Sequence, residues 1–156
     1  MPILFLDTSA LIKLYVAEIG SNWLRHYVNG QQIAISELAF FEVANALRRR
    51  YTEGTYTRDE ATDLFGQIEK GSTDYEIVAL GGQLQLNRVL TLLFSLPGGQ
   101  RLRTLDSLHL AAAEQVQEDA SQLTPPQPLV FLSSDIQLLR AAQLLGLTTE
   151  NPESHP

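Results

Sequence analysis

A short apolar run that ends near an aspartate and leads directly into a helical pattern occurs twice in this sequence. The first run is Ile3–Leu6, followed by Asp7, and the second is Leu129–Leu132, followed by two serines and Asp135. Consecutive apolar residues without polar alternation are typical of a strand buried on both faces, as in parallel sheets covered by helices. Both aspartates are therefore expected to follow the carboxyl ends of buried strands, where open α/β sheets bind ligands.

The rest of the chain alternates between strand and helix patterns. Brief apolar runs predict further strands at residues 33–35, 75–80 and 147–149, and the segments between the strands have helical spacing. Such alternation implies a parallel sheet with right-handed crossovers. We therefore predict a three-layer α/β fold, with a central parallel sheet of four to five strands and helices on both faces.

The length of the chain and its composition fit one conventional domain. Its 156 residues can bury about two-thirds of the unfolded surface without disulfides or metals. The predicted elements place a single domain at residues 1–149, and residues 150–156 are expected to be a disordered tail. The chain has no cysteine, no run approaching the ~20 apolar residues that cross a bilayer and no secretory signal, so a cytoplasmic protein is expected.

Two further acids stand within apolar helical segments. Glu42 interrupts a long apolar run and forms a polar stripe with Asn45 and Arg49, while Asp106 falls in the first turn of the helix predicted after Thr104, its expected cap. Both acids have an ordinary explanation. Glu42 could simply face solvent, and a carboxylate in the first turn of a helix is favoured by the helix macrodipole. The strand-ending aspartates could likewise be helix caps.

A chemical role for the acids follows if they converge. The carboxyl ends of parallel strands share one edge of the sheet, so Asp7 and Asp135 meet there if their strands are neighbours, and Glu42 and Asp106 can reach the same edge. Two carboxylates ~4 Å apart repel by roughly 4 kcal/mol at an effective dielectric constant of 20. Such a cluster is stable only when protonated or filled with cations. Oxygen ligands without cysteine suit Mg²⁺ or Mn²⁺.

The acids and their sequence context resemble the acidic signature of PIN-domain ribonucleases, especially the VapC-type toxins of prokaryotic toxin–antitoxin pairs. The matching segments are DTS, SELAFFEVANAL, LRTLDSLHLA and FLSSDIQLL, and the resemblance covers essentially the whole chain. It implies a PIN-like fold. It also implies roles for six side chains: Asp7, Glu42, Asp106 and Asp135 as catalytic and metal-binding acids, with Ser9 and Ser133 as supporting hydroxyls.

The resemblance further implies a Mg²⁺- or Mn²⁺-dependent endoribonuclease, the toxin of a type II toxin–antitoxin system, which hydrolyses RNA phosphodiester bonds with a metal-activated water. A small antitoxin partner and a homodimer are implied as well. The net charge of −7 argues against RNA binding by overall charge but does not exclude a nuclease, in which the basic residues would have to be grouped locally. The candidates for the RNA backbone are Lys13, Arg49, Arg101 and Arg103, each of which could instead serve only solubility.

Two other functions stay open at this point. A phosphatase that forms an aspartyl-phosphate on Asp7 is possible, but such enzymes usually have a second aspartate two residues later, where this chain has Ser9. A non-catalytic interaction module could also keep the fold without the chemistry. His109, one turn after Asp106, is interpreted as a core or helix-surface histidine more readily than as a ligand.

Overall fold

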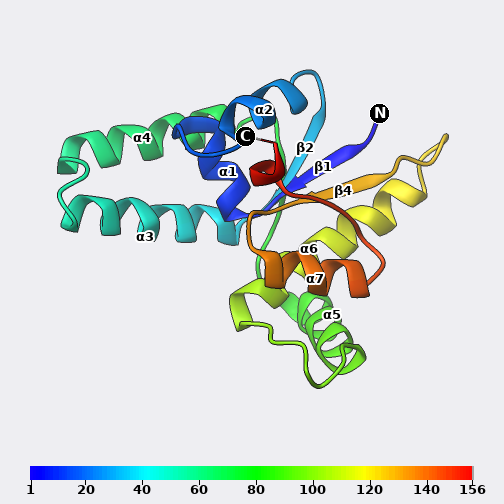
Figure 1. Ribbon diagram of the computed structural model, residues 1–156. Helices are drawn as coiled ribbons and strands as arrows, with labels where there is room; N and C mark the ends of the chain where they lie inside the picture. The colour runs from blue at the N-terminus through cyan, green and yellow to red at the C-terminus, as the bar shows by residue number, and fades with distance from the viewer. Residues whose placement is uncertain (156) are drawn as a thin grey trace.

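The computed structural model describes residues 1–155, which form a three-layer α/β fold around one five-stranded parallel sheet (Figure 1). The strand order is β3-β2-β1-β4-β5, and every adjacent pair is parallel. The chain builds one half of the sheet outward from β1 and then crosses to build the other half, so β1 and β4 flank the point where the order reverses. The predicted parallel sheet is confirmed, and its bounds are β1 Ile3–Leu6, β2 Gln32–Ser36, β3 Glu76–Val78, β4 Leu129–Leu132 and β5 Thr148–Glu150.

Alternate residues of β1 face two separate hydrophobic cores. Ile3 and Phe5 pack with α5, α6 and α7, and the Phe5 ring stacks on Phe131 of β4. Leu4 and Leu6 pack with α1 to α4 on the opposite face. The continuous apolar pattern of β1 follows from burial on both sides. The helices within residues 1–155 are α1 Thr8–Tyr15, α2 Ser21–Tyr27, α3 Leu38–Thr52, α4 Arg58–Gly71, α5 Gly82–Ser95, α6 Thr104–Ser121 and α7 Ile136–Leu144.

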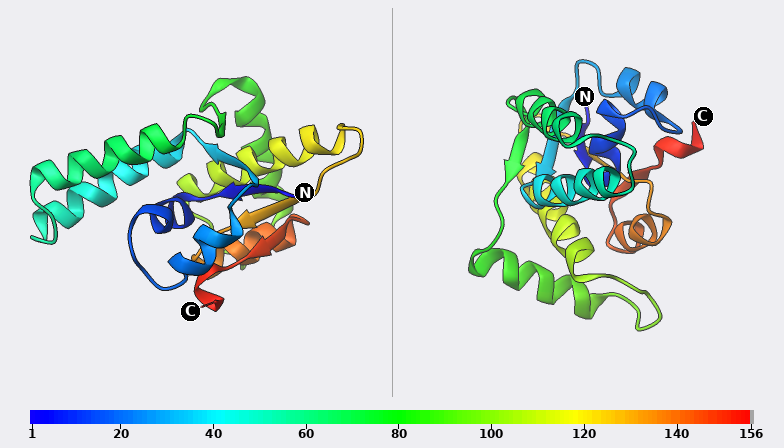
Figure 2. Two further views of the ribbon diagram at one scale, coloured as in Figure 1. Left: turned by 90° about the horizontal axis from the view of Figure 1, so that it is seen from above. Right: turned by 90° about the vertical axis from the view of Figure 1, so that its left-hand side faces the viewer.

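Helices α3 and α4 form an antiparallel pair that extends past the edge of the sheet (Figure 2). The second helix begins at a capping box, in which Glu60 N donates to Thr57 Oγ1 and Thr57 N donates to the Glu60 side chain. No helix in the described part of the chain, residues 1–155, has the length and apolar character needed to cross a membrane.

Residues 150–155, which the sequence suggested to be a disordered tail, instead complete the fold. Pro152–Ser154 forms a 3₁₀-helix, η1, and Pro152 is buried. Glu153 pairs with Lys13 at 2.9 Å, and the His155 ring stacks on Trp23 with 4.1 Å between ring centroids. The polar composition of this segment concealed the ion pair and the ring contact that hold it. Pro156 lies outside the described residues.

The packing of η1 on α2 depends on the absence of a side chain at Gly20. This residue has φ +82°, and a Cβ built on it would lie 2.2 Å from the carbonyl oxygen of Pro152. We expect Gly20→Ala to lower the free energy of unfolding by about 1–3 kcal/mol, measured by urea denaturation. Gly30→Ala is the matched control, because φ is +74° there but nothing lies within 4 Å of the added Cβ. Equal losses in both variants would contradict the close approach of η1.

Candidate active site

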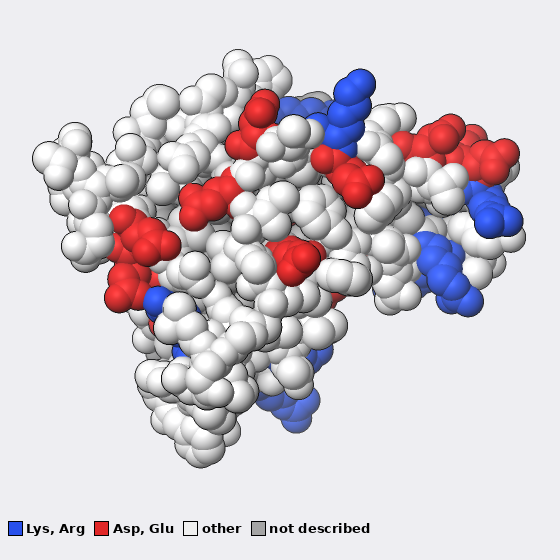
Figure 3. Space-filling view, turned by 180° about the vertical axis from the view of Figure 1, so that it is seen from behind, with Lys and Arg blue, Asp and Glu red and all other residues white. Residues whose placement is uncertain are grey.

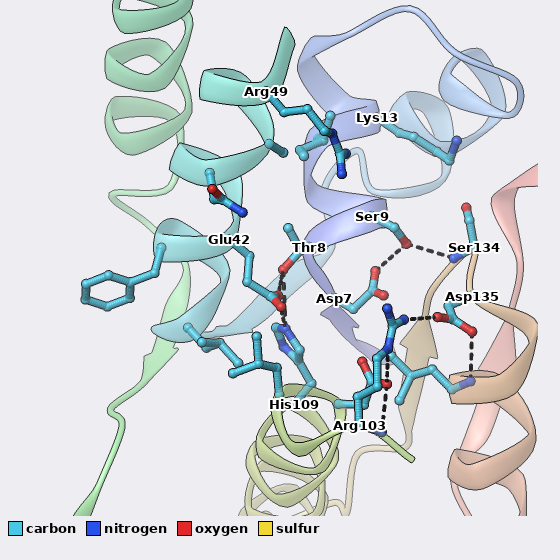
Figure 4. A pocket seen from close by; sticks show the side chains of 18 of the residues that line it. Asp7, Thr8, Ser9, Lys13, Glu42, Arg49, Arg103, His109, Ser134 and Asp135 are labelled. Carbon is cyan, nitrogen blue, oxygen red and sulfur yellow. Dashed lines mark hydrogen bonds and ion pairs between the residues drawn. The ribbon is translucent and has the colours of Figure 1, made fainter. Parts of the chain in front are cut away.

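The carboxyl edge of β1 and β4 opens into a cavity of about 710 Å³. The parallel register pairs Leu6 with Leu132, and Asp7 N donates to Leu132 O at 3.1 Å, so the residues that follow the two strands lie side by side. Figure 4 shows side chains from α1, α3, α6 and the β4–α7 junction pointing into this space. The structure brings four sequence-predicted acids to the lining of this one cavity: Asp7, Glu42, Asp106 and Asp135.

Asp7 is buried and hydrogen-bonded from both strand ends. Its Oδ1 accepts from Ser9 Oγ at 2.7 Å and from Ala10 N at 2.9 Å, and its Oδ2 accepts from Ser133 Oγ at 2.6 Å. The carboxylate therefore caps α1 and also faces the cavity. Asp7 can thus be both a helix cap and a candidate active-site acid. Burial raises the pKa of Asp7 above its ordinary value, although His109 and the hydroxyl and amide donors oppose the shift.

The two serines predicted as supporting hydroxyls tie the loops of the site together. Besides donating to Asp7, Ser9 Oγ accepts from Ser134 N at 2.9 Å, and Ser133 Oγ accepts from Asp135 N at 2.9 Å. Each hydroxyl thus joins the Asp7 carboxylate to the backbone that follows β4. The position of Asp135 relative to Asp7 is fixed by these four hydrogen bonds.

Glu42 is held by side chains from two other helices. Its Oε2 accepts from Thr8 Oγ1 of α1 and from His109 Nε2 of α6, the latter at 2.6 Å. Burial alone would raise the pKa of Glu42, but these hydrogen bonds and the nearby positive charge outweigh it and lower the pKa below its ordinary value. The contact with His109, 67 residues away in the chain, is one that the helical pattern around Glu42 did not predict.

Asp106 and Asp135 share one guanidinium group. Arg103 Nε donates to Asp106 Oδ2 at 3.1 Å, and Arg103 Nη2 donates to Asp135 Oδ2 at 2.8 Å. The other oxygen of Asp135 caps α7 by accepting from two backbone amides. The sequence predicted Thr104 as the N-cap residue of α6, which is one residue too late. The N-cap residue is Arg103, and its backbone amide donates to the Asp106 side chain.

The carboxylate oxygens that line the cavity are suitable ligands for a divalent cation, although in this structure the four predicted acids are hydrogen-bonded or ion-paired to other side chains of the protein. Within residues 1–155, no group of three or more His, Asp or Glu side chains is gathered closely enough to hold a metal ion. The Arg103 guanidinium is a positive group between Asp106 and Asp135, and so stands in for a cation there. Carboxylate oxygens are the ligands that hard divalent cations take. Asp106 and Asp135 could therefore hold a metal in place of this guanidinium.

The basic residues predicted to contact RNA occupy different surroundings. Arg49 and Arg103 line the cavity, whereas Arg101 is exposed and is not part of the lining. Lys13 also lines the cavity, but its side chain is buried and its ammonium pairs with Glu18 at 3.2 Å as well as with Glu153. Lys13 therefore stabilises the join between α1 and the end of the chain, a role that helical periodicity around it did not indicate.

The PIN domain family model matches residues 4–144, a range that begins in β1 and ends with α7. The chain belongs to the PIN domain family. Its match covers the four acids that the sequence predicted for the site, Asp7, Glu42, Asp106 and Asp135, and the PIN-like fold predicted from the sequence is confirmed. VapC nucleases with this PIN domain are generally dependent on divalent metal ions.

This PIN domain resembles known proteins along nearly its whole length. It is 29% identical over 153 residues to "Ribonuclease VapC46" of Mycobacterium tuberculosis, covering 97% of this chain and 99% of that protein. FitAcB from Neisseria gonorrhoeae has a similar structure, with a TM-score of 0.70, 12% identity and coverage of 98% and 99% of the two chains. A toxin–antitoxin complex from Klebsiella pneumoniae gives a TM-score of 0.61, 14% identity and coverage of 96% and 97%.

The raised pKa of Asp7 has a consequence for stability that can be measured without metal. A carboxyl group whose pKa is higher in the folded than in the unfolded protein stabilises the fold below the unfolded pKa of about 4, and this contribution is lost as the pH rises through the folded pKa. Asn at this position stays neutral and keeps an oxygen for capping. In EDTA, we expect Asp7→Asn to be more stable than the unchanged protein at about pH 7–8, with the difference shrinking toward about pH 4.5.

The measurement is the midpoint of thermal unfolding at a series of pH values. Asp63→Asn on the exposed surface of α4 is the control, since no buried carboxylate is removed there. A stability difference for Asp7→Asn that does not change with pH, or that changes with the opposite sign, would show that the burial of the charged carboxylate does not cost stability.

Proposed function

We propose that this PIN domain is a divalent-metal-dependent endoribonuclease that serves as the toxin of a type II toxin–antitoxin system. The observation that carries the proposal is the meeting of four carboxylates, drawn from distant parts of the chain, in the lining of one cavity. A relative of nearly equal length is named a ribonuclease, which supports RNA as the substrate. The proposed catalytic acids are Asp7, Glu42, Asp106 and Asp135.

Mg²⁺ or Mn²⁺ is the proposed cofactor, because the donor set offers carboxylate oxygens and the chain has no cysteine. Asp7, Asp106 and Asp135 are the proposed ligands, and they would have to draw closer together than they lie in this structure to hold one ion. When bound, such an ion supplies Lewis-acid polarisation of the phosphoryl group and activation of water. Glu42 would help to hold the ion or orient the attacking water, with its carboxylate kept ionised by the Thr8 and His109 hydrogen bonds.

The protein groups also position the substrate. The Asp7 carboxylate cannot turn away from the cavity, because donors from two strand ends hold both of its oxygens. Arg49 and Arg103 line the cavity beside the acids and would contact the RNA backbone on either side of the reacting phosphate. Arg103 would be free to do so once a metal ion replaces it between Asp106 and Asp135.

An antitoxin and a second copy of this chain are the proposed partners. A toxin–antitoxin complex of the same fold supports the first. The second is supported by α5, which exposes apolar side chains on a surface with few charges, seen at the lower left of Figure 3: Leu86, Leu90, Leu93 and Phe94. A cytoplasmic location is proposed, since RNA and the antitoxin would be met there.

The catalytic role of Asp7 is tested by Asp7→Asn. We expect the variant to keep its far-ultraviolet circular dichroism spectrum and to lose RNA cleavage in Mn²⁺ by more than the 10–100-fold, or about 1.4–2.7 kcal/mol, that removal of a supporting group causes. Cleavage is measured by sequencing the fragments released from total RNA by the purified protein. Asp63→Asn, on exposed α4, should cleave normally. Full activity of Asp7→Asn with metal present would refute the assignment.

Metal binding is tested at Arg103. Because its guanidinium occupies Asp106 and Asp135, a cation must displace it, and we expect Arg103→Gln to bind Mn²⁺ several-fold more tightly in a calorimetric titration. The matched control is Arg101→Gln, which removes an equal charge two residues away at an exposed position outside the cavity. Weaker Mn²⁺ binding by Arg103→Gln, or equal tightening in both variants, would contradict competition for these carboxylates.

A further inference from the structure

We infer that His109 is a positioning residue of this site, which acts through Glu42 by holding one oxygen of its carboxylate so that the other is presented to the cavity. The inference rests on the proposed function and extends it to a residue outside the four acids. Three side chains carry it, Thr8, Glu42 and His109, and Figure 4 shows them pointing toward one another at the wall of the cavity.

The three side chains come from helices on both faces of the sheet. Thr8 begins α1 and Glu42 lies on α3, which share one hydrophobic core, whereas His109 lies on α6 in the other core. They meet just beyond the carboxyl edge of the strands. His109 Nε2 lies 2.6 Å from Glu42 Oε2 and 3.3 Å from Thr8 Oγ1. The contact therefore joins the two layers of helices at the site itself.

The hydrogen-bond roles in this group are determined by the carboxylate. Glu42 Oε2 can only accept when ionised, so Thr8 Oγ1 and His109 Nε2 are both donors to it. Both donors use the same oxygen, which leaves Oε1 available to the cavity. Hydrogen-bonded partners of this kind fix the orientation of metal-binding carboxylates, and their loss typically lowers metal affinity or activity 10–100-fold.

The surroundings of His109 argue that its imidazole is present for Glu42 and not for packing. Its side chain is 2% exposed, and its Nδ1 is buried without a hydrogen-bond partner. A buried nitrogen without a partner destabilises the folded state. An apolar side chain of similar size would fill this place without an unpaired nitrogen. What the imidazole offers that an apolar side chain does not is the hydrogen bond to Glu42.

The test compares His109→Leu with His109→Gln. The amide nitrogen of Gln can reach the place of Nε2 and donate to Glu42, whereas Leu keeps the volume and removes the donor. We expect His109→Leu to lower Mn²⁺ affinity, and kcat at saturating Mn²⁺, by about 10–100-fold, and His109→Gln to recover most of the loss. KM for RNA should be nearly unchanged in both. The midpoint of thermal unfolding in EDTA should change little for His109→Leu, because loss of the hydrogen bond to Glu42 is offset by removal of the unpaired nitrogen.

Several outcomes would overturn the inference. Unchanged Mn²⁺ affinity and kcat in His109→Leu would do so, as would equal loss of stability and activity in both variants, which indicates a packing role. Thr8→Val provides a second route if His109→Leu does not fold, since it removes the other donor to the same oxygen and should lower Mn²⁺ affinity in the same direction. Unchanged Mn²⁺ affinity in Thr8→Val would then count against the inference.

The test also separates this inference from the proposed function. If the unchanged protein binds Mn²⁺ and cleaves RNA while His109→Leu matches it, only the role of His109 is refuted. If the unchanged protein neither binds Mn²⁺ nor cleaves RNA, the proposed function fails and the inference fails with it.

Discussion

The buried carboxylate of Asp7, held by donors from the ends of two neighbouring strands, is the interaction on which the site depends. Parallel pairing of β1 with β4 places Ser133 beside it, and the turn into α1 places Ser9 there too. Both hydroxyls then bind the backbone that leads to Asp135. The strand order, which reverses between β1 and β4, therefore determines where a ligand can bind and which side chains surround it.

The cavity keeps several carboxylates together by giving them separate partners. Serine hydroxyls bind Asp7, Thr8 and His109 bind Glu42, and Arg103 joins Asp106 to Asp135. Repulsion between unpaired carboxylates would otherwise reach several kcal/mol at close range. Of these partners, Arg103 is the one on the open side, with a side chain 76% exposed, so its ion pairs are screened by solvent and readily exchanged.

The features that were predictable from the sequence are those that repeat along the chain. Apolar runs marked β1 and β4, and the residues directly after them identified Asp7 and Asp135, because parallel strands end at a common edge. Contacts between distant helices leave no such pattern. The meeting of Glu42 with His109 depends on how α3 and α6 sit on opposite faces, and the ordered end of the chain depends on Lys13 and Gly20.

Two side chains whose burial costs the fold stability, Asp7 and His109, line the same cavity. Asp7 is a buried carboxylate with a raised pKa at the carboxyl end of β1, and His109 leaves one nitrogen without a partner. A neutral side chain in place of Asp7 would remove the cost of burying a charge, and an apolar one in place of His109 would remove the unpaired nitrogen. The proposed cation would account for both, since its charge would stabilise the ionised Asp7 and it would need a Glu42 held in one orientation.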